Sequence, residues 1–384
     1  MDLRDSGDDR AFRDEIRGFL EDGLGGDFAV VRGRGGPGDE DVLFDERLAW
    51  EKHLASHRWT CVAWPEEHGG RGLPLRQQVI YHEEYARAGG PGRLGLIGEG
   101  LIGPTIIAFG TPEQHKRFLP PIVAGEELWC QGYSEPDAGS DLANLQTRAV
   151  RDGDGWRVTG QKVWTSLAHW SDWCFVLART APLAPGGKKH HGISYLLVPM
   201  RQDGVEIRPI VQLTGDREFN EVFFDGARTA ADHVVGDVDD GWRVAMGTLA
   251  FERGALTLGQ QLNFRSELDE IVRLASGRTA GDPVLRQRLV QAHIGLEIMR
   301  LNALRSNPRT DSINKLYWAT LHRSIGELAM DVLGPASVAA EPGTDDRLQR
   351  MFLFSRADTI YGGSNQIQRN IIGERVLGLP KEPK

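Results

Sequence analysis

The chain of 384 residues is poor in cysteine and has no excess of basic residues. Its three cysteines, Cys61, Cys130 and Cys174, show no C-x-x-C spacing, and one would stay unpaired in any set of internal disulfides. We therefore expect buried free thiols and a reducing compartment. Aspartate and glutamate outnumber lysine and arginine by 54 to 45, which argues against a general nucleic-acid or anionic-membrane binder.

Long hydrophobic runs and common ligand motifs are missing as well. No apolar stretch reaches membrane-spanning length, and the first residues lack an apolar signal segment, so we expect a cytoplasmic protein without a membrane partner. No G-x-G-x-x-G string follows a predicted strand, which excludes a Rossmann-type dinucleotide site. The segment 188–191, Lys-Lys-His-His, could contact a phosphate or a metal, but no cluster has zinc-ligand spacing. A solvated loop is the better interpretation, and no metal site is predicted.

Hydrophobic periodicity divides the chain into three regions. Helical spacing dominates residues 1–126, a period of about two governs 127–236, and long amphipathic helices with short connections fill 237–384. These patterns predict an α+β fold with an N-terminal α-helical domain, a middle antiparallel β-domain and a C-terminal helical bundle. The most complete helix start is Thr111-Pro112-Glu113-Gln114, with a Thr N-cap, Pro at the first helical position and Gln three residues after the cap.

The periodicity also predicts individual elements. In the middle domain, strands are expected over 145–150, 156–164, 173–179, 193–199, 205–210 and 221–224. In the last domain, helices are expected over 242–276, 284–306, 312–333 and 348–360, with a final helix beginning near Asn365, which is expected to be its N-cap.

The stretch from Trp129 to Ser166 carries the most informative motifs, YSEPDAGSD at 133–141 and GQKVWTS at 160–166. Pro136 fixes its own φ and Gly139 can supply a positive φ, so the chain bends there. A bend lined with hydroxyls and free amides can hold the polar edge of a cofactor. Both strings resemble the flavin- and substrate-binding signature of the acyl-CoA dehydrogenase family, and PEEHGGRG at 65–72 extends the resemblance.

The resemblance implies the acyl-CoA dehydrogenase fold, which ends in a four-helix bundle, with FAD between the β-domain and that bundle. By position, Tyr133 and Ser134 would meet the pyrimidine side of the flavin ring. Trp164 would lie against the flavin face or edge, and the hydroxyl of Ser166 near its reactive nitrogen. Taken singly, a Trp on an alternating strand is more often part of a core, so this interpretation depends on the motifs occurring together.

The adenosine and pyrophosphate end of FAD would, by the same resemblance, be met by Ser364 and Gln366. A Ser in a glycine-rich turn more often caps that turn. Arg278 corresponds to a family segment that contacts the flavin of a neighbouring subunit, and this segment is shortened here.

The expected reaction removes an α proton from a thioester and passes a β hydride to flavin, which requires a carboxylate whose pKa is raised by burial. Many family members carry this Glu directly after the Tyr of the C-terminal loop, where this chain has Gly362 after Tyr361. Isovaleryl- and long-chain-type members carry it on the first bundle helix, where this chain has Glu252. A Glu-Arg pair in a helix is ordinarily solvated or salt-bridged, but the matching Gly362 makes Glu252 the expected base.

The remaining site residues also follow from the resemblance. Ser140 would lie near the pantetheine arm of CoA, Tyr361 would line the acyl cavity, and Arg253 would order a neighbouring loop or the acyl-CoA. The main-chain N–H of Gly362 would bind the thioester oxygen. The product would be a trans-2-enoyl-CoA, an electron-transfer flavoprotein would accept the electrons, and the chain would form a homotetramer or a hetero-oligomer with a related chain.

Three alternatives stay open. The chain could be a flavin oxidase or monooxygenase on the same fold, or a non-catalytic subunit, which the altered Arg278 region suggests. A carrier-protein thioester could replace CoA. The length and branching of the acyl group cannot be read from the sequence.

Overall fold

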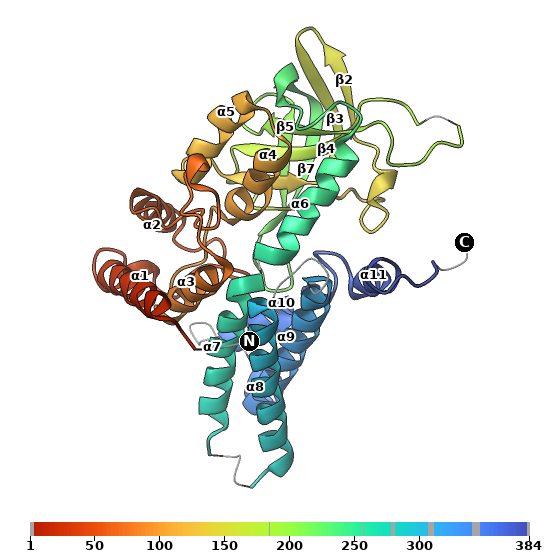
Figure 1. Cartoon of the computed structure of the whole chain (residues 1–384). Coiled ribbons are helices and arrows are strands. Elements are labelled where there is room, and N and C mark those ends of the chain that lie inside the picture. The colour runs from red at the N-terminus through yellow and green to blue at the C-terminus, as the bar shows by residue number, and fades with distance from the viewer. Residues whose placement is uncertain are drawn as a thin grey trace. The chain divides into compact units, whose positions relative to one another are not determined.

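The structure is a computed structural model that describes residues 4–183, 185–255, 257–277, 281–305, 311–339 and 346–381. The side chains of residues 252–259 and 311–312 lie outside this description. The chain divides into two compact units, one built mainly of helices and one built on a sheet (Figure 1). The helical unit comprises Met1–Asp27, Leu75–Gly90 and Arg253–Lys384, and the sheet unit comprises Phe28–Pro74 and Pro91–Glu252. The domain boundaries at 126/127 and 236/237 stay predictions.

In the described part of the sheet unit, seven strands form one sheet. They are β1 (Trp129–Gly132), β2 (Arg148–Asp152), β3 (Gly155–Ser166), β4 (Trp173–Arg179), β5 (Ile193–Pro199), β6 (Val205–Ile210) and β7 (Phe219–Ala230). Their order is β1-β4-β2-β3-β7-β6, and β5 pairs with β4. All six predicted strands are confirmed, and β4, β5 and β6 have the predicted bounds.

The sheet is mixed, so the prediction of an antiparallel domain is wrong for two of its pairings. β1 runs parallel to β4, with Trp129 opposite Trp173, and β2 meets β4 in parallel through Arg148 and Arg179. Alternation along a strand shows which side chains share a face, but it does not show the direction of the partner strand. The chain between β1 and β4 is long enough to return in the same direction, as a parallel pair requires.

The strands β4 and β5 are buried on both faces, which explains their nearly continuous apolar sequences. One face packs Phe175 and Tyr195 against a cluster that includes Phe118, while Cys174 and Val198 belong to the cluster on the other face. The helices of this unit are α2 (Phe44–Ser56), α4 (Gly103–Phe109), α5 (Pro112–Val123) and the greater part of α6 (Gly241–Ala255), which passes into the helical unit at Arg253. Cys61, Cys130 and Cys174 are all buried and free, as predicted.

The predicted start of α5 is confirmed. The hydroxyl of Thr111 accepts a hydrogen bond from the main-chain N–H of Gln114 (3.2 Å), and the side chain of Gln114 accepts one from the N–H of Thr111 (3.1 Å). Two of the helix's first N–H groups are thereby satisfied. Phe118 and Leu119 then point into the core.

The helical unit contains α1 (Gly7–Gly25), α3 (Leu75–Arg87), α7 (Thr257–Ala275), α8 (Pro283–Leu304), α9 (Asp311–Leu333), α10 (Arg347–Phe354) and α11 (Asn365–Ile371). Helices α7, α8 and α9 lie side by side and bury a core that includes Leu268, Leu296 and Trp318 (Figure 1). The single helix expected over 242–276 is described as α6 and α7, and residue 256 between them lies outside the described residues. Among the described helices, none has the length and apolar character needed to cross a bilayer.

Candidate functional site

The predicted site residues fall into two groups, one in each unit. Those in the sheet unit are Tyr133, Ser134, Ser140, Trp164, Ser166 and Glu252, and those in the helical unit are Arg253, Arg278, Tyr361, Gly362, Ser364 and Gln366. Glu252 and Arg253 lie in α6, but their side chains lie outside the described residues, as does the whole of Arg278.

The loop after β1 begins with a buried ring and then makes a tight turn. Tyr133 is buried, and its ring packs edge-on against Phe175, with ring centroids 5.7 Å apart. Glu135 and Ala138 then exchange main-chain hydrogen bonds of 3.2 and 3.0 Å across the turn that contains Pro136. Ser140 follows this turn and is exposed.

A buried ion pair fixes the start of this loop to β3. Lys162 is 0% exposed, and its ammonium group donates to the main-chain oxygen of Tyr133 (3.1 Å) and to Oε1 of Glu135 (2.8 Å). Glu135 also accepts the main-chain N–H groups of Gln146 (2.5 Å) and Thr147 (2.9 Å). Burial raises the pKa of the Glu135 carboxyl, but Lys162 and these donors outweigh it and hold that pKa below its ordinary value. The Glu135 carboxylate is therefore ionised, while burial lowers the pKa of the Lys162 ammonium group that faces it.

The importance of Lys162 and Glu135 was not predicted from the sequence, although both lie inside the two motifs. Alternation along β3 provides a signal, because it places the charged Lys162 on the same face as buried Val158, where a lysine needs a partner. The sequence does not show which carboxylate lies opposite.

Trp164 lies at an irregularity in the pairing of β3. The pairing of β3 with β7 is irregular between Lys162 and Thr165, and Trp164 has φ of 60°, a conformation that L-residues seldom adopt. The residue is 59% exposed, and its ring lies edge-on to the ring of Phe219. Trp164 combines an exposed position with a strained backbone, which makes it a candidate for contact with a ligand. The interpretation of Trp164 as ordinary core therefore does not hold.

The loop and Trp164 lie together. The main-chain N–H of Val163 donates to the oxygen of Ser134 (2.9 Å), so Ser134 sits beside the residue that precedes Trp164. Ser166, two positions beyond Trp164, is half-buried and pairs with Phe219. This part of the sheet unit thus combines a flat aromatic side chain with two hydroxyl groups.

In the helical unit, the C-terminal loop is held by its own polar groups. The hydroxyl of Tyr361 donates to Oδ1 of Asp358 (2.8 Å), and the side-chain amide of Gln368 donates to the main-chain oxygen of Gly362 (3.0 Å). Gly362 and Gly363 have φ of 60° and 81°, which glycine adopts without strain. Tyr361 and Gly362 therefore lie in one ordered turn.

Ser364 is the N-cap of α11, because its hydroxyl accepts the main-chain N–H of Ile367 (3.3 Å). The expectation that Asn365 caps this helix is wrong. Both residue types are good N-caps, and the choice depends on which of them has non-helical backbone angles, which a single sequence does not show. Gln366 lies in the first turn of α11 and is exposed.

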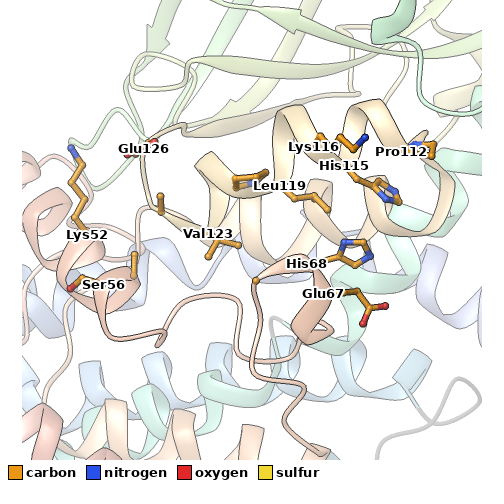
Figure 2. Close-up of a pocket in the computed structure, with 14 residues that line it drawn as sticks. Lys52, Ser56, Glu67, His68, Pro112, His115, Lys116, Leu119, Val123 and Glu126 are labelled. Carbon is orange, nitrogen blue, oxygen red and sulfur yellow. The ribbon is translucent and has the colours of Figure 1, made fainter.

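A separate cavity of about 880 Å³ lies elsewhere in the sheet unit (Figure 2). Its walls come from the end of α2, the turn at Glu66–His68 and α5. Leu119 and Val123 contribute apolar surface, and the rings of His68 and His115 lie 5.0 Å apart. None of the predicted site residues lines this cavity.

Comparison with protein-family models shows which family the chain belongs to. Three family models match it in succession, the N-terminal domain of acyl-CoA dehydrogenases over residues 6–126, the middle domain over 130–227 and the C-terminal domain over 239–377. The chain belongs to the acyl-CoA dehydrogenase family. It is accordingly an oxidoreductase with the acyl-CoA dehydrogenase fold, as the sequence motifs predict.

Similar acyl-CoA dehydrogenases occur in mycobacteria. The chain is 59% identical to acyl-CoA dehydrogenase IpdE1 of Mycolicibacterium smegmatis, over 97% of this chain and 98% of that protein, and 58% identical to IpdE1 of Mycobacterium tuberculosis over the same shares. Among solved structures, it is similar to the Tcur3481-Tcur3483 steroid ACAD, with 30% identity, a TM-score of 0.85 and complete coverage of both chains. The ChsE4-ChsE5 complex from Mycobacterium tuberculosis gives 31% identity, a TM-score of 0.84 and the same coverage.

Proposed function

We propose that this acyl-CoA dehydrogenase binds FAD and converts an acyl-CoA thioester to its trans-2-enoyl-CoA. The observation that carries the proposal is Trp164, which is exposed and strained beside Ser134 and Ser166. A flat ring and two hydroxyls suit the face and the polar edge of an isoalloxazine ring. In the reaction, bound FAD would supply a hydride acceptor for the substrate β carbon.

On the sheet side, Tyr133 and Ser134 would hold the pyrimidine edge of the flavin, and Ser140 would meet the pantetheine arm. The Lys162–Glu135 pair supports this assignment because it fixes the main chain at Tyr133. In the helical unit, Ser364 and Gln366 would meet the adenosine and pyrophosphate, and Arg278 would contribute to a neighbouring flavin. The capping bond made by Ser364 leaves its hydroxyl hydrogen available to donate to a phosphate.

We assign removal of the substrate α proton to the Glu252 carboxylate. The main-chain N–H of Gly362 would donate a hydrogen bond to the thioester oxygen. Glu252 occupies the first bundle helix, where part of the family carries the base, and Gly362 occupies the loop position that would otherwise carry it. The positive φ of Gly362 supports the first assignment, because a glutamate at this loop position would be strained. Tyr361 would line the acyl cavity and Arg253 would order the acyl-CoA.

For the substrate, we propose a bulky acyl-CoA of steroid origin, because a solved relative with 30% identity is described as a steroid ACAD. We also propose a hetero-oligomer with a related chain, because one similar structure is described as the ChsE4-ChsE5 complex and the other carries two protein names. On α8, exposed apolar side chains recur at helical spacing and form a stripe suited to a subunit contact: Val290, Ile294, Ile298 and Leu301. An electron-transfer flavoprotein would accept the electrons, in the cytoplasm.

The test is an anaerobic titration of the FAD-loaded protein with short, branched, long and steroid-side-chain acyl-CoAs, following loss of the flavin's visible absorption. Bleaching by the steroid-derived thioester supports the proposal, and bleaching only by another class would replace the substrate assignment. Rapid reoxidation of the reduced flavin by oxygen would instead indicate an oxidase. If no thioester bleaches the fully FAD-loaded protein, even with a partner chain added, the chain is a non-catalytic subunit.

A further inference from the structure

A buried histidine in the helical unit lies between two carboxylates. His322 of α9 is 5% exposed, and its Nδ1 lies 2.5 Å from Oδ2 of Asp358 while its Nε2 lies 3.0 Å from Oε2 of Glu267. A neutral imidazole has a proton on only one nitrogen, whereas two carboxylates facing both nitrogens require two N–H donors. The geometry therefore selects the imidazolium cation.

The surroundings of His322 agree with a charged ring. Burial lowers the pKa of His322, but Glu267 and Asp358 outweigh it and raise that pKa to about 9. Phe264 stacks on the ring, with centroids 3.9 Å apart and planes at 10°, so the orientation of the ring is fixed. The charged groups facing it are Glu267 from α7 and Asp358, while Lys315 of α9 donates to the main-chain oxygen of Asp358 (2.6 Å).

Asp358 connects this cluster to the C-terminal loop. One of its carboxylate oxygens binds His322, and the other accepts the hydroxyl of Tyr361 (2.8 Å). The main-chain N–H of Tyr361 donates to the oxygen of Ala357 (3.1 Å), and Gly362 follows directly. Lys315 and the rings of Trp318 and Phe354 also lie near the ring of Tyr361. A change in the orientation of Asp358 would therefore move the side chain of Tyr361, and with it the main chain at Gly362.

We propose that His322 is a positioning residue that acts through Asp358 to hold the Tyr361–Gly362 turn. This inference rests on the proposed function, in which the main-chain N–H of Gly362 binds the thioester oxygen. The cation holds the Asp358 carboxylate in its orientation, and Asp358 in turn fixes the hydroxyl of Tyr361. When His322 loses its proton, one of its nitrogens no longer donates, so a buried carboxylate faces a lone pair and the turn loosens.

The kinetic test compares wild type, H322Q and H293Q, all loaded with FAD, in single-turnover flavin reduction by a reactive acyl-CoA from pH 6.5 to 10. H293Q is a matched control because His293 is an exposed histidine on α8 of the same unit. We expect the wild-type and H293Q rates to fall as pH passes about 9. For H322Q we expect a rate about tenfold lower at pH 7.5 and no ionisation near pH 9. An H322Q profile that matches wild type in rate and shape would overturn the proposal.

A second measurement is independent of the reaction. Hydrogen–deuterium exchange of the peptide spanning residues 357–366 should be about tenfold faster in H322Q than in wild type or H293Q at pH 7. In the unaltered protein, exchange corrected for its intrinsic pH dependence should accelerate as pH passes about 9. If no thioester reduces the wild-type flavin but this exchange behaves as expected, the proposed function fails and the positioning role stands. Exchange that is unchanged in H322Q and flat through pH 9 would contradict the positioning role directly.

Discussion

The two groups of predicted site residues, one in each unit, are held in place by different kinds of buried charge. In the sheet unit, a lysine and a glutamate fix the loop at Tyr133, while in the helical unit a histidine between two carboxylates fixes the turn at Tyr361. The Lys162–Glu135 pair and the His322 cluster each order a short loop, but the two respond to pH in opposite directions.

The signs follow from the direction of each pKa change. The pKa of Glu135 is lowered from 4.5 in the folded protein, so its contribution to stability is present above that value and is lost as pH falls further. The pKa of His322 is raised from 6.5 to about 9, so its contribution is complete below 6.5 and is lost as pH rises through about 9. The loop at Tyr133 should therefore lose stability in acid, and the turn at Tyr361 should lose stability in alkali.

The largest effect on stability is expected for K162M. The substitution leaves the buried Glu135 without its cation, and breaking a buried pair from one side should lower the free energy of unfolding by about 3–5 kcal/mol. Urea unfolding at pH 7 measures this difference.

The control for K162M is K116M, which removes an exposed lysine of α5 in the same unit and should cost no more than about 0.5 kcal/mol. The double variant E135Q/K162M removes both charges and should recover part of the loss. A K162M protein within about 1 kcal/mol of wild type would mean that the pair does not hold the loop as described.

A smaller effect is expected for G362A on the helical side. Gly362 has φ of 60°, and an alanine in this left-handed conformation costs about 1–2 kcal/mol. Urea unfolding should show this loss, whereas G373A, in the helical turn Ile372–Val376 of the same unit, should be neutral or slightly stabilising. If G362A unfolds at the same urea concentration as wild type, the turn is not constrained as the structure shows it.

Much of the fold could be predicted from local sequence, because its elements have strong local signals. The capping residues Thr111 and Gln114 mark the start of α5, and the alternating or continuous apolar runs mark β4, β5 and β6. The parallel pairing of β1 with β4 was missed, since strand direction depends on the whole path between Trp129 and Trp173.

The site could be predicted only in part. Motif resemblance points to Trp164 and Gly362, and the structure adds a positive φ at both, which is strained at Trp164 and accessible to Gly362. Partnerships across the fold were missed, because Lys162 with Glu135 and His322 with Asp358 join residues 27 and 36 positions apart. A lysine or histidine in an amphipathic segment looks solvated until its buried neighbours are known.

The most direct test of the account is the rate of anaerobic flavin reduction in E252Q, measured in a stopped-flow instrument with the acyl-CoA that bleaches the wild type. E113Q, an exposed Glu-to-Gln change on α5, is the matched control and should reduce its flavin within about twofold of wild type. If Glu252 removes the α proton, E252Q should bind FAD normally and reduce it about 10²–10⁴-fold more slowly. An E252Q protein that reduces its flavin at the wild-type rate would contradict the assignment of the base.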